Sequence, residues 1–186
     1  NGRSVSIKSP NDAAALGIQI VYQDLALCEN LDVAANLSLG SEPVKDGWSF
    51  LPKFMRPIDS LEMEAKAKKA IEQLQVRTLH SVRAKVGGLS GGQRQAIAIA
   101  RAVGTESSVV MLDEPTAALG VAQTKQVLEM VKRLRDTNHA VVYISHNMRD
   151  IFEVSDRITV LRHGDNVATY KTSETSTDEI VVAMTS

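Results

Sequence analysis

Short apolar segments of strand length alternate along this chain with longer segments of helical periodicity. The strand-like segments span residues 17–22, 109–112, 140–145 and 157–161. Neighbouring parallel strands need a crossover connection, which is usually a helix, and those helices then cover the faces of the sheet. The alternation therefore predicts an α/β fold with a mostly parallel, helix-covered sheet.

Three helices are expected from the spacing of apolar residues. The first follows Asp59, whose carboxylate can cap it, and its apolar positions recur at helical spacing as far as Leu74. The second and third are expected at residues 93–103 and 124–135. These helices supply the layers that a parallel sheet requires.

Two further segments have turn-rich sequences. The stretch 40–60 holds three of the five prolines, so little regular structure is expected there. The turn sequence at 163–165 precedes a short strand-like segment at 166–170, which we expect to pair with the strand before it as a hairpin.

The composition excludes several classes of protein. Lys and Arg number 21 against 22 Asp and Glu, and this net charge of -1 offers no basic excess for a nucleic-acid backbone. No apolar run approaches the roughly 20 residues of a membrane-spanning helix. The single cysteine, Cys28, cannot form an intramolecular disulfide, which is typical of a reducing compartment.

A glycine-rich segment, LSGGQ at residues 89–93, directly precedes the Ala-rich helix. Gly91 and Gly92 allow close approach of a ligand to the backbone, Ser90 offers a hydroxyl, and the helix start offers unpaired N–H groups. These features suit a phosphate group. The alternative is a glycine-rich turn in which Ser90 caps the helix.

Two adjacent carboxylates end the strand-like segment VVMLDEP at residues 109–115. A parallel strand delivers its last residues to the carboxyl edge of the sheet, where ligands bind in open α/β folds. Asp113 is suited to orient Mg²⁺, because hard cations prefer carboxylate oxygens. Glu114 is suited to act as general base on an attacking water. The alternative is that both acids cap the next helix.

Two other strand-like segments also end in polar residues. His146 follows the segment at 140–145 and can hydrogen-bond a terminal phosphate, although an isolated histidine is more often a surface or packing residue. Gln23 follows the segment at 17–22, where an amide can contact a metal ion or a water. The sequence therefore predicts that four polar groups share one edge of the sheet.

In their order and spacing these segments resemble the nucleotide-binding domain of the ATP-binding cassette (ABC) transporters. LSGGQ followed by RQAIAIARA is similar to the signature motif, VVMLDEP to the Walker B strand with its catalytic glutamate, YISH to the switch histidine, and VYQD to the Q-loop. The segments VYQDLALCENLDVAANLSLG, EPTAALG and ISHNM most resemble the ATPases of bacterial ribose-, xylose- and fructose-type importers.

This resemblance implies a fold, a substrate and a set of site residues. It implies a P-loop NTPase-like ATPase core formed by residues 1–23 and 104–186, and a helical subdomain at 24–103 that contains the signature motif. ATP is the implied substrate and Mg²⁺ the cofactor. The implied catalytic residues are Glu114 and His146, the nucleotide-binding residues are Gln23, Ser90, Gly91, Gly92 and Gln93, and the metal-binding residues are Asp113 and Gln23.

The resemblance also implies partners and a location. Two such domains pair head to tail, so that the signature motif of one contacts the γ-phosphate held by the other. The helical subdomain is expected to meet a membrane permease at the cytoplasmic face of the inner membrane, with a sugar-binding protein acting indirectly and no nucleic acid involved. The stretch 48–54 is a candidate contact surface, or a loop that packs on its own subdomain. The competing hypothesis is a non-catalytic, degenerate cassette that only completes its partner's ATP site.

Two departures from the family pattern lead to further expectations. The sequence contains no G-x-x-x-x-G-K-[ST] loop and begins at Asn1 without a methionine, so we expect an N-terminally truncated and inactive fragment. Its missing strand is expected to leave a gap or a rearranged sheet between the strands at 140–145 and 157–161, with poor stability. Gly120 occupies a position where many members have Asp, and it is expected to be a harmless variant that caps the helix starting near Val121.

Overall fold

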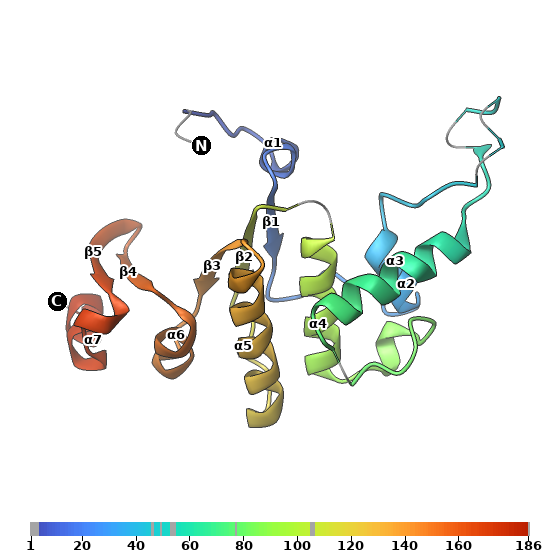
Figure 1. Ribbon diagram of the computed structural model, residues 1–186. Helices are drawn as coiled ribbons and strands as arrows, with labels where there is room; N and C mark the ends of the chain where they lie inside the picture. The colour runs from blue at the N-terminus through green and yellow to red at the C-terminus, as the bar shows by residue number, and fades with distance from the viewer. Residues whose placement is uncertain are drawn as a thin grey trace.

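The computed structural model describes residues 4–45, 47–48, 50–52, 55–76, 78–104 and 107–185. Its elements follow one another along the chain as shown in Figure 1. They are α1 (Pro10–Ala15), β1 (Ile18–Val21), α2 (Val33–Ser38), α3 (Ser60–Gln73), η2 (Val86–Gly88), α4 (Gly91–Val103), β2 (Val109–Asp113), α5 (Val121–Asp136), β3 (Ala140–Ile144), α6 (Met148–Val154), β4 (Arg157–Arg162), β5 (Asp165–Lys171), η3 (Thr172–Glu174) and α7 (Thr177–Thr185). No described helix is both long and apolar enough to cross a membrane.

The strands β1, β2 and β3 form a parallel sheet in that order, which confirms the predicted α/β class. Leu112 is central in this sheet, because it pairs with Val21 of β1 on one side and with Tyr143 of β3 on the other. The predicted hairpin is also confirmed, since β4 and β5 pair antiparallel in a separate two-stranded sheet.

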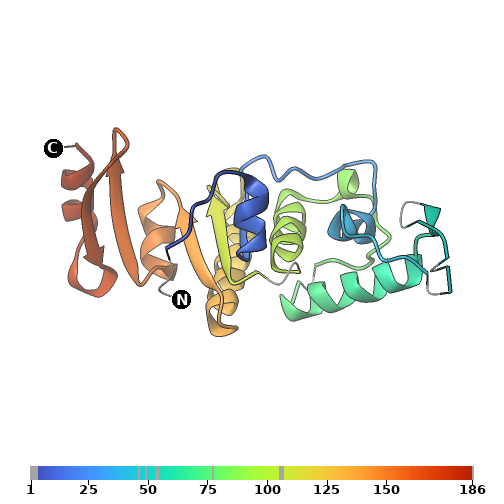
Figure 2. The same ribbon diagram turned by 90° about the horizontal axis from the view of Figure 1, so that it is seen from above.

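One face of the parallel sheet is covered by α4 and α5. Ile97 and Ile99 of α4, Val127 of α5, and Val110 and Leu112 of β2 are all fully buried in one core. The two helices pack against each other, so they cover this face as one layer. Figure 2 shows the resulting elongated molecule, with α2 and α3 at one end and the β4–β5 hairpin with α7 at the other.

The helix boundaries follow from capping groups. Asp59 caps α3 as predicted, with its Oδ1 accepting from the N–H groups of Leu61 and Glu62 at 3.1 and 3.0 Å. The starts of α4 and α5 expected from helical spacing alone were two or three residues late, because helical backbone begins directly after the caps Ser90 and Gly120. Gly120 as a helix cap is thus confirmed.

The turn-rich stretch 40–60 has little regular structure in its described part, as predicted. It contains one isolated bridge, Val44 with Ile58, before α3 begins. Trp48 and Phe50 stack with ring centroids 5.8 Å apart, and Phe50 remains 75% exposed. Phe54, the last residue of the predicted contact surface, lies outside the described residues, as do Asn1 and Gly2.

The predicted gap between the third and fourth strands is present. Among the described strands, β3 pairs only with β2, and β4 pairs only with β5. A groove of about 650 Å³ separates them, and it is lined by β3, α6, β4 and α7. Figure 1 shows the β4–β5 hairpin standing apart from the parallel sheet.

The second face of the parallel sheet is partly open. Ile20, Met111 and Val142 form one row across the three strands on this face. Ile20 and Val142 are 40% and 42% exposed, and Ile144 further along β3 is 45% exposed. Parallel sheets are normally covered on both faces, so this surface and the adjoining edge of β3 favour association with other apolar surfaces.

Substitution of Val142 by Lys should reduce self-association of the 186-residue chain. A charge on an exposed edge strand opposes edge-to-edge pairing, and at this half-exposed position it displaces little packing. Light scattering over a concentration series measures the effect, with Leu61→Lys as the matched control on α3, where Leu61 is 76% exposed. Equal association of the two variants would show that the chains do not associate through the open edge of β3.

Candidate active site

The carboxyl ends of β1, β2 and β3 meet at one edge of the sheet. Asp113 is the last residue of β2 and pairs with Ile144 of β3, so the residues that follow both strands lie at the same level. Gln23 follows β1 at this edge and is exposed to solvent. The predicted convergence of strand ends at a common edge is therefore present in the fold.

Glu114 and His146 are in direct contact at this edge. Glu114 Oε1 lies 2.7 Å from His146 Nδ1 and also accepts from the backbone N–H of His146 at 3.1 Å. Ser145 Oγ donates to the other carboxylate oxygen, Oε2, at 3.4 Å. Since a carboxylate accepts hydrogen bonds, Nδ1 is the donor in this contact and Nε2 is the nitrogen left for a ligand. The side chains are 20% exposed for Glu114 and 77% for His146, so the pair borders solvent.

The backbone of Glu114 adopts a conformation that is uncommon for a residue with a side chain. Its φ of +46° lies in the left-handed region. Its N–H donates to the carbonyl of Ile144 at 2.9 Å, which extends the bonding between β2 and β3 by one residue, and the following Pro115 is fully buried. Such strained residues persist where their surroundings fix them, and they concentrate at functional sites.

The residues predicted to bind a metal ion have suitable ligand atoms but do not form a complete site by themselves. The half-buried Asp113 offers carboxylate oxygens and Gln23 offers an amide oxygen, both of which suit Mg²⁺. Among the described residues no group of three or more His, Cys, Asp or Glu side chains is arranged to hold a metal ion. A Mg²⁺ ion here would therefore take the rest of its ligands from water and from substrate phosphates, as it commonly does.

The glycine-rich segment forms the start of α4, with Ser90 as its cap. Gln93 N–H donates to Ser90 Oγ at 3.4 Å, and Gln93 Oε1 accepts from Ser90 N–H at 2.9 Å, so the two residues form a reciprocal capping box. Gln93 Nε2 also donates to the Thr78 carbonyl at 2.6 Å. The capping alternative is confirmed for Ser90, and the hydroxyl oxygen acts there as acceptor, which leaves its proton for a ligand.

Gly92 has a packing role that the sequence did not reveal. A Cβ atom at this position would lie 3.0 Å from Cγ and 3.1 Å from Cβ of Gln123 on α5. The glycine therefore lets α4 and α5 approach closely. Because α4 ends just before β2 begins, its N-terminus points toward the carboxyl edge of the sheet. Among the described residues, no hydrogen bond joins the N-terminus of α4 to Glu114 or His146.

Arg101 of α4 holds the loop that follows Gln23, and sequence reasoning missed it. Its guanidinium donates to the carbonyls of Ala26 at 2.8 Å and Leu25 at 3.0 Å, two residues with φ of +45° and +60°. Burial lowers the pKa of Arg101, which nevertheless stays charged at neutral pH. The contact spans more than 70 residues of sequence, so local patterns contain no signal for it.

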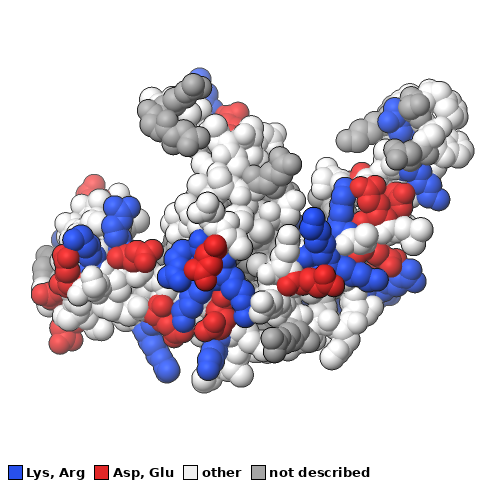
Figure 3. All heavy atoms as spheres, in the orientation of Figure 1, with Lys and Arg blue, Asp and Glu red and all other residues white. Residues whose placement is uncertain are grey.

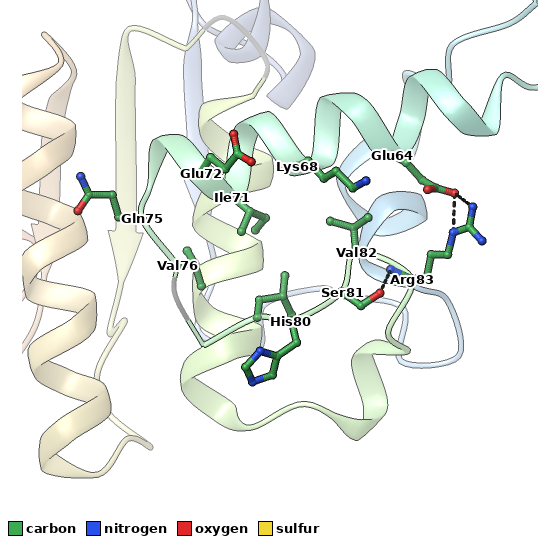
Figure 4. Close-up of a pocket in the computed structure, with 11 residues that line it drawn as sticks. Glu64, Lys68, Ile71, Glu72, Gln75, Val76, His80, Ser81, Val82 and Arg83 are labelled. Atoms are coloured by element: carbon green, nitrogen blue, oxygen red, sulfur yellow. Dashed lines mark hydrogen bonds and ion pairs between the residues drawn. The ribbon is translucent and has the colours of Figure 1, made fainter.

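A separate pocket of about 580 Å³ lies beside α3, away from the carboxyl edge (Figure 4). Lys68 and Glu72 border it from α3, and Glu64 forms an ion pair with Arg83 across its end at 2.8 Å. Charges of both signs alternate over α3 and α5 on the face shown in Figure 3. Neither Glu114 nor His146 lines this pocket, so it is not part of the candidate active site.

Comparison with known families and curated proteins gives a consistent result. Residues 2–117 match the family model described as "ABC transporter". The chain is 40% identical over 184 residues to the fructose import ATP-binding protein FrcA of Rhizobium meliloti, and 41% identical over 185 residues to the xylose/arabinose import ATP-binding protein XylG of Sulfolobus acidocaldarius. These alignments cover 99% and 100% of this chain and 70% of each relative. The ribose import ATP-binding protein RbsA of Yersinia pestis is 37% identical over 98% of this chain, which spans only 34% of that relative.

Solved structures show the same fold. A nucleotide-free ATP-binding cassette from an ABC transporter superposes with a TM-score of 0.70 at 25% identity, over 88% of this chain and 64% of that one. The ADP conformation of MJ1267, an ATP-binding cassette of an ABC transporter, gives a TM-score of 0.72 at 23% identity, over 95% of this chain and 71% of that one. The second likeness concerns the fold alone.

Proposed function

Because the chain belongs to the ABC transporter family, we propose that it is the ATP-binding and ATP-hydrolysing part of a sugar importer. The observation that supports this most strongly is the contact between Glu114 and His146 at the carboxyl edge of the parallel sheet. The relatives named above are import ATP-binding proteins for fructose, xylose or arabinose, and ribose. Nothing in these comparisons supports the alternative of a non-catalytic cassette.

In this proposal Glu114 is the general base for hydrolysis. Its carboxylate accepts a proton from a water molecule as the water oxygen bonds to the γ-phosphorus of ATP, and the bond from that phosphorus to the β,γ-bridging oxygen breaks to release ADP. With the imidazole protonated on both nitrogens, His146 Nε2 donates to the terminal phosphate, while Nδ1 donates to the Glu114 carboxylate and keeps it oriented. Asp113 and Gln23 would hold Mg²⁺, which would neutralise phosphate charge when bound.

The signature segment acts on a second nucleotide. We assign residues 1–23 and 104–186 to the ATPase core and residues 24–103 to the helical subdomain. Ser90, Gly91, Gly92 and Gln93 would contact the γ-phosphate of ATP held by a second ATPase domain paired head to tail. The N-terminus of α4, which has the positive end of the helix dipole and the exposed cap Ser90, supports this role.

The proposed partners follow from the family. The helical subdomain would contact a transmembrane permease at the cytoplasmic face of the inner membrane, and a sugar-binding protein would deliver the sugar to that permease. The chain itself would be a peripheral component of the complex. The balanced charge of the chain gives no support to a nucleic-acid partner.

Phosphate release by the assembled transporter tests the proposal. The natural full-length protein, with its permease in lipid vesicles, should release phosphate from ATP when Mg²⁺ is present and stop when EDTA removes it. Uptake of a labelled pentose or hexose should require the same ATP. The proposal fails if phosphate release with Mg²⁺ and ATP does not exceed that of vesicles containing the permease alone.

A further inference from the structure

A hydrogen-bonded chain of three side chains lies among the elements that flank Glu114 and His146. Tyr143 of β3, Thr116 in the loop after β2, and Asp150 of α6 form it. Thr116 Oγ1 lies 2.7 Å from Asp150 Oδ2 and 3.2 Å from the Tyr143 hydroxyl. Asp150 is 3% exposed and Thr116 is 7% exposed, so water hardly reaches this bond.

The direction of the hydrogen bonds in this chain follows from its chemistry. The Asp150 carboxylate accepts from the single proton of the Thr116 hydroxyl. Thr116 Oγ1 must then accept in its contact with Tyr143, whose hydroxyl donates. Burial raises the pKa of Tyr143 to about 12, which keeps that hydroxyl protonated and able to donate near neutral pH.

The chain connects the two loops that hold the active-site pair. Thr116 lies two residues after Glu114, with the fully buried Pro115 between them. Asp150 lies four residues after His146, in the first turn of α6, which Asn147 caps by accepting from Arg149 N–H at 3.1 Å. The bond between Thr116 and Asp150 therefore fixes the distance between the Glu114 loop and the start of the helix that follows His146.

A buried carboxylate is costly, and the proposed hydrolysis step does not use Asp150. Removing a carboxylate from water has a large cost unless hydrogen bonds replace its hydration. The Thr116 hydroxyl supplies a short, charge-assisted hydrogen bond of this kind. This bond lies between the two loops whose residues Glu114 and His146 are in contact at 2.7 Å. Holding these loops together is a role for the buried carboxylate.

We propose that Thr116 and Asp150 are positioning residues that hold Glu114 and His146 in register for ATP hydrolysis. This inference rests on the proposed function. Neither residue reaches the substrate, and their bond instead limits the movement of the Glu114 carboxylate relative to the imidazole. A shift of about 1 Å in a reacting group can cost on the order of 100-fold in rate, so loss of the bond should appear mainly in kcat.

The matched variants Thr116→Val and Thr116→Ser test the inference in the natural full-length protein assembled with its permease. Val has nearly the shape of Thr but no hydroxyl, so kcat for ATP hydrolysis should fall about 10- to 100-fold while KM for ATP changes less than about twofold. Ser keeps the hydroxyl and should retain kcat within about twofold. Thr137→Val, which removes a hydroxyl at the C-terminal end of α5, is the remote control.

A double-variant comparison and an exchange measurement separate positioning from general stability. Asp150→Asn should lower kcat like Thr116→Val, and combining both should add little, because each breaks the same bond. Backbone amide exchange of His146, whose N–H donates to Glu114, should accelerate in Thr116→Val and Asp150→Asn but not in Thr116→Ser or Thr137→Val. If Asp150→Asn fails to fold, the Val and Ser pair at position 116 decides alone.

The outcomes distinguish this inference from the proposed function. Full kcat in Thr116→Val, in a protein whose hydrolysis is lost in Glu114→Gln, overturns the positioning role and leaves the proposed function intact. Equal losses in Thr116→Val and Thr116→Ser would also overturn it, since the hydroxyl would then not matter. Absence of hydrolysis in the unmodified assembled protein overturns the proposed function itself.

Discussion

Substitution of Glu114 by Gln should lower kcat for ATP hydrolysis by roughly 10²- to 10⁴-fold, the usual contribution of a general base. Gln has the same shape as Glu, and its amide oxygen can still accept from the His146 backbone N–H, so the loop geometry should persist. An amide cannot accept the proton of the attacking water. Steady-state phosphate release by the natural full-length protein measures kcat, and equilibrium titration measures the Kd for ATP.

The loss should be confined to chemistry. The Kd for ATP should stay within about threefold, because only the catalytic proton acceptor has been removed and uniform binding is unchanged. Nucleotide-dependent dimerisation should also survive. Glu174→Gln is the matched control, since Glu174 of η3 is an exposed carboxylate that pairs with Lys171 of β5. Equal turnover of the Glu114→Gln and unmodified proteins would refute the assignment of Glu114 as base.

Substitution of Leu112 by Ala should lower the free energy of unfolding by about 2–5 kcal/mol, the range for large-to-small changes in a core. Leu112 is fully buried in the central strand, paired with neighbours in β1 and β3, and α4 and α5 pack on its side of the sheet. Urea unfolding followed by circular dichroism measures the change. A loss of this size is a large part of the free energy of unfolding of a typical domain.

The matched control for this prediction is Leu161→Ala. Leu161 lies in β4 of the separate hairpin and is 68% exposed, so its truncation removes little buried area. A change within about 0.5 kcal/mol is expected there, as for other surface substitutions. A loss at Leu112 no larger than that at Leu161 would show that the β1–β2–β3 sheet is not the stabilising core.

Sequence reasoning located the strand ends well because apolar runs and the polar residues that follow them are local signals. Asp113, Glu114 and His146 each follow such a run, and parallel pairing then brings them to one edge. Hairpin pairing of β4 with β5 was likewise predicted from the turn between them. The contact between Glu114 and His146 follows from this topology, although its 2.7 Å distance does not.

The contacts that sequence reasoning missed join residues far apart in the chain. Arg101 reaches the loop at Leu25, and Thr116 reaches Asp150, without any periodicity to indicate these pairs. Gln93 illustrates another limit. It matched a ligand-binding motif, yet in the structure its amide bonds to Ser90 and to Thr78. Residue type and spacing did not reveal that internal role.

The gap beside β3 was predicted by comparing this sequence with a family pattern, and it is present in the structure. Among the described strands β3 pairs only with β2, and Ile20 and Val142 are exposed, with Met111 half-buried in the same row. Apolar side chains on a parallel strand normally meet a covering helix layer. The open face is a reason to expect poor stability of the 186-residue chain alone. This stays a prediction, which thermal unfolding of that chain tests.

The most direct test of the account is a structure of the Glu114→Gln protein, at its natural length, with Mg²⁺ and ATP bound. We expect the terminal phosphate to lie within hydrogen-bonding distance of His146 and of the partner's Ser90, with Mg²⁺ near Asp113 and Gln23. Nucleotide bound elsewhere, with residues 113 and 146 facing away from its phosphates, would contradict the proposal that this edge of the sheet is the site of hydrolysis.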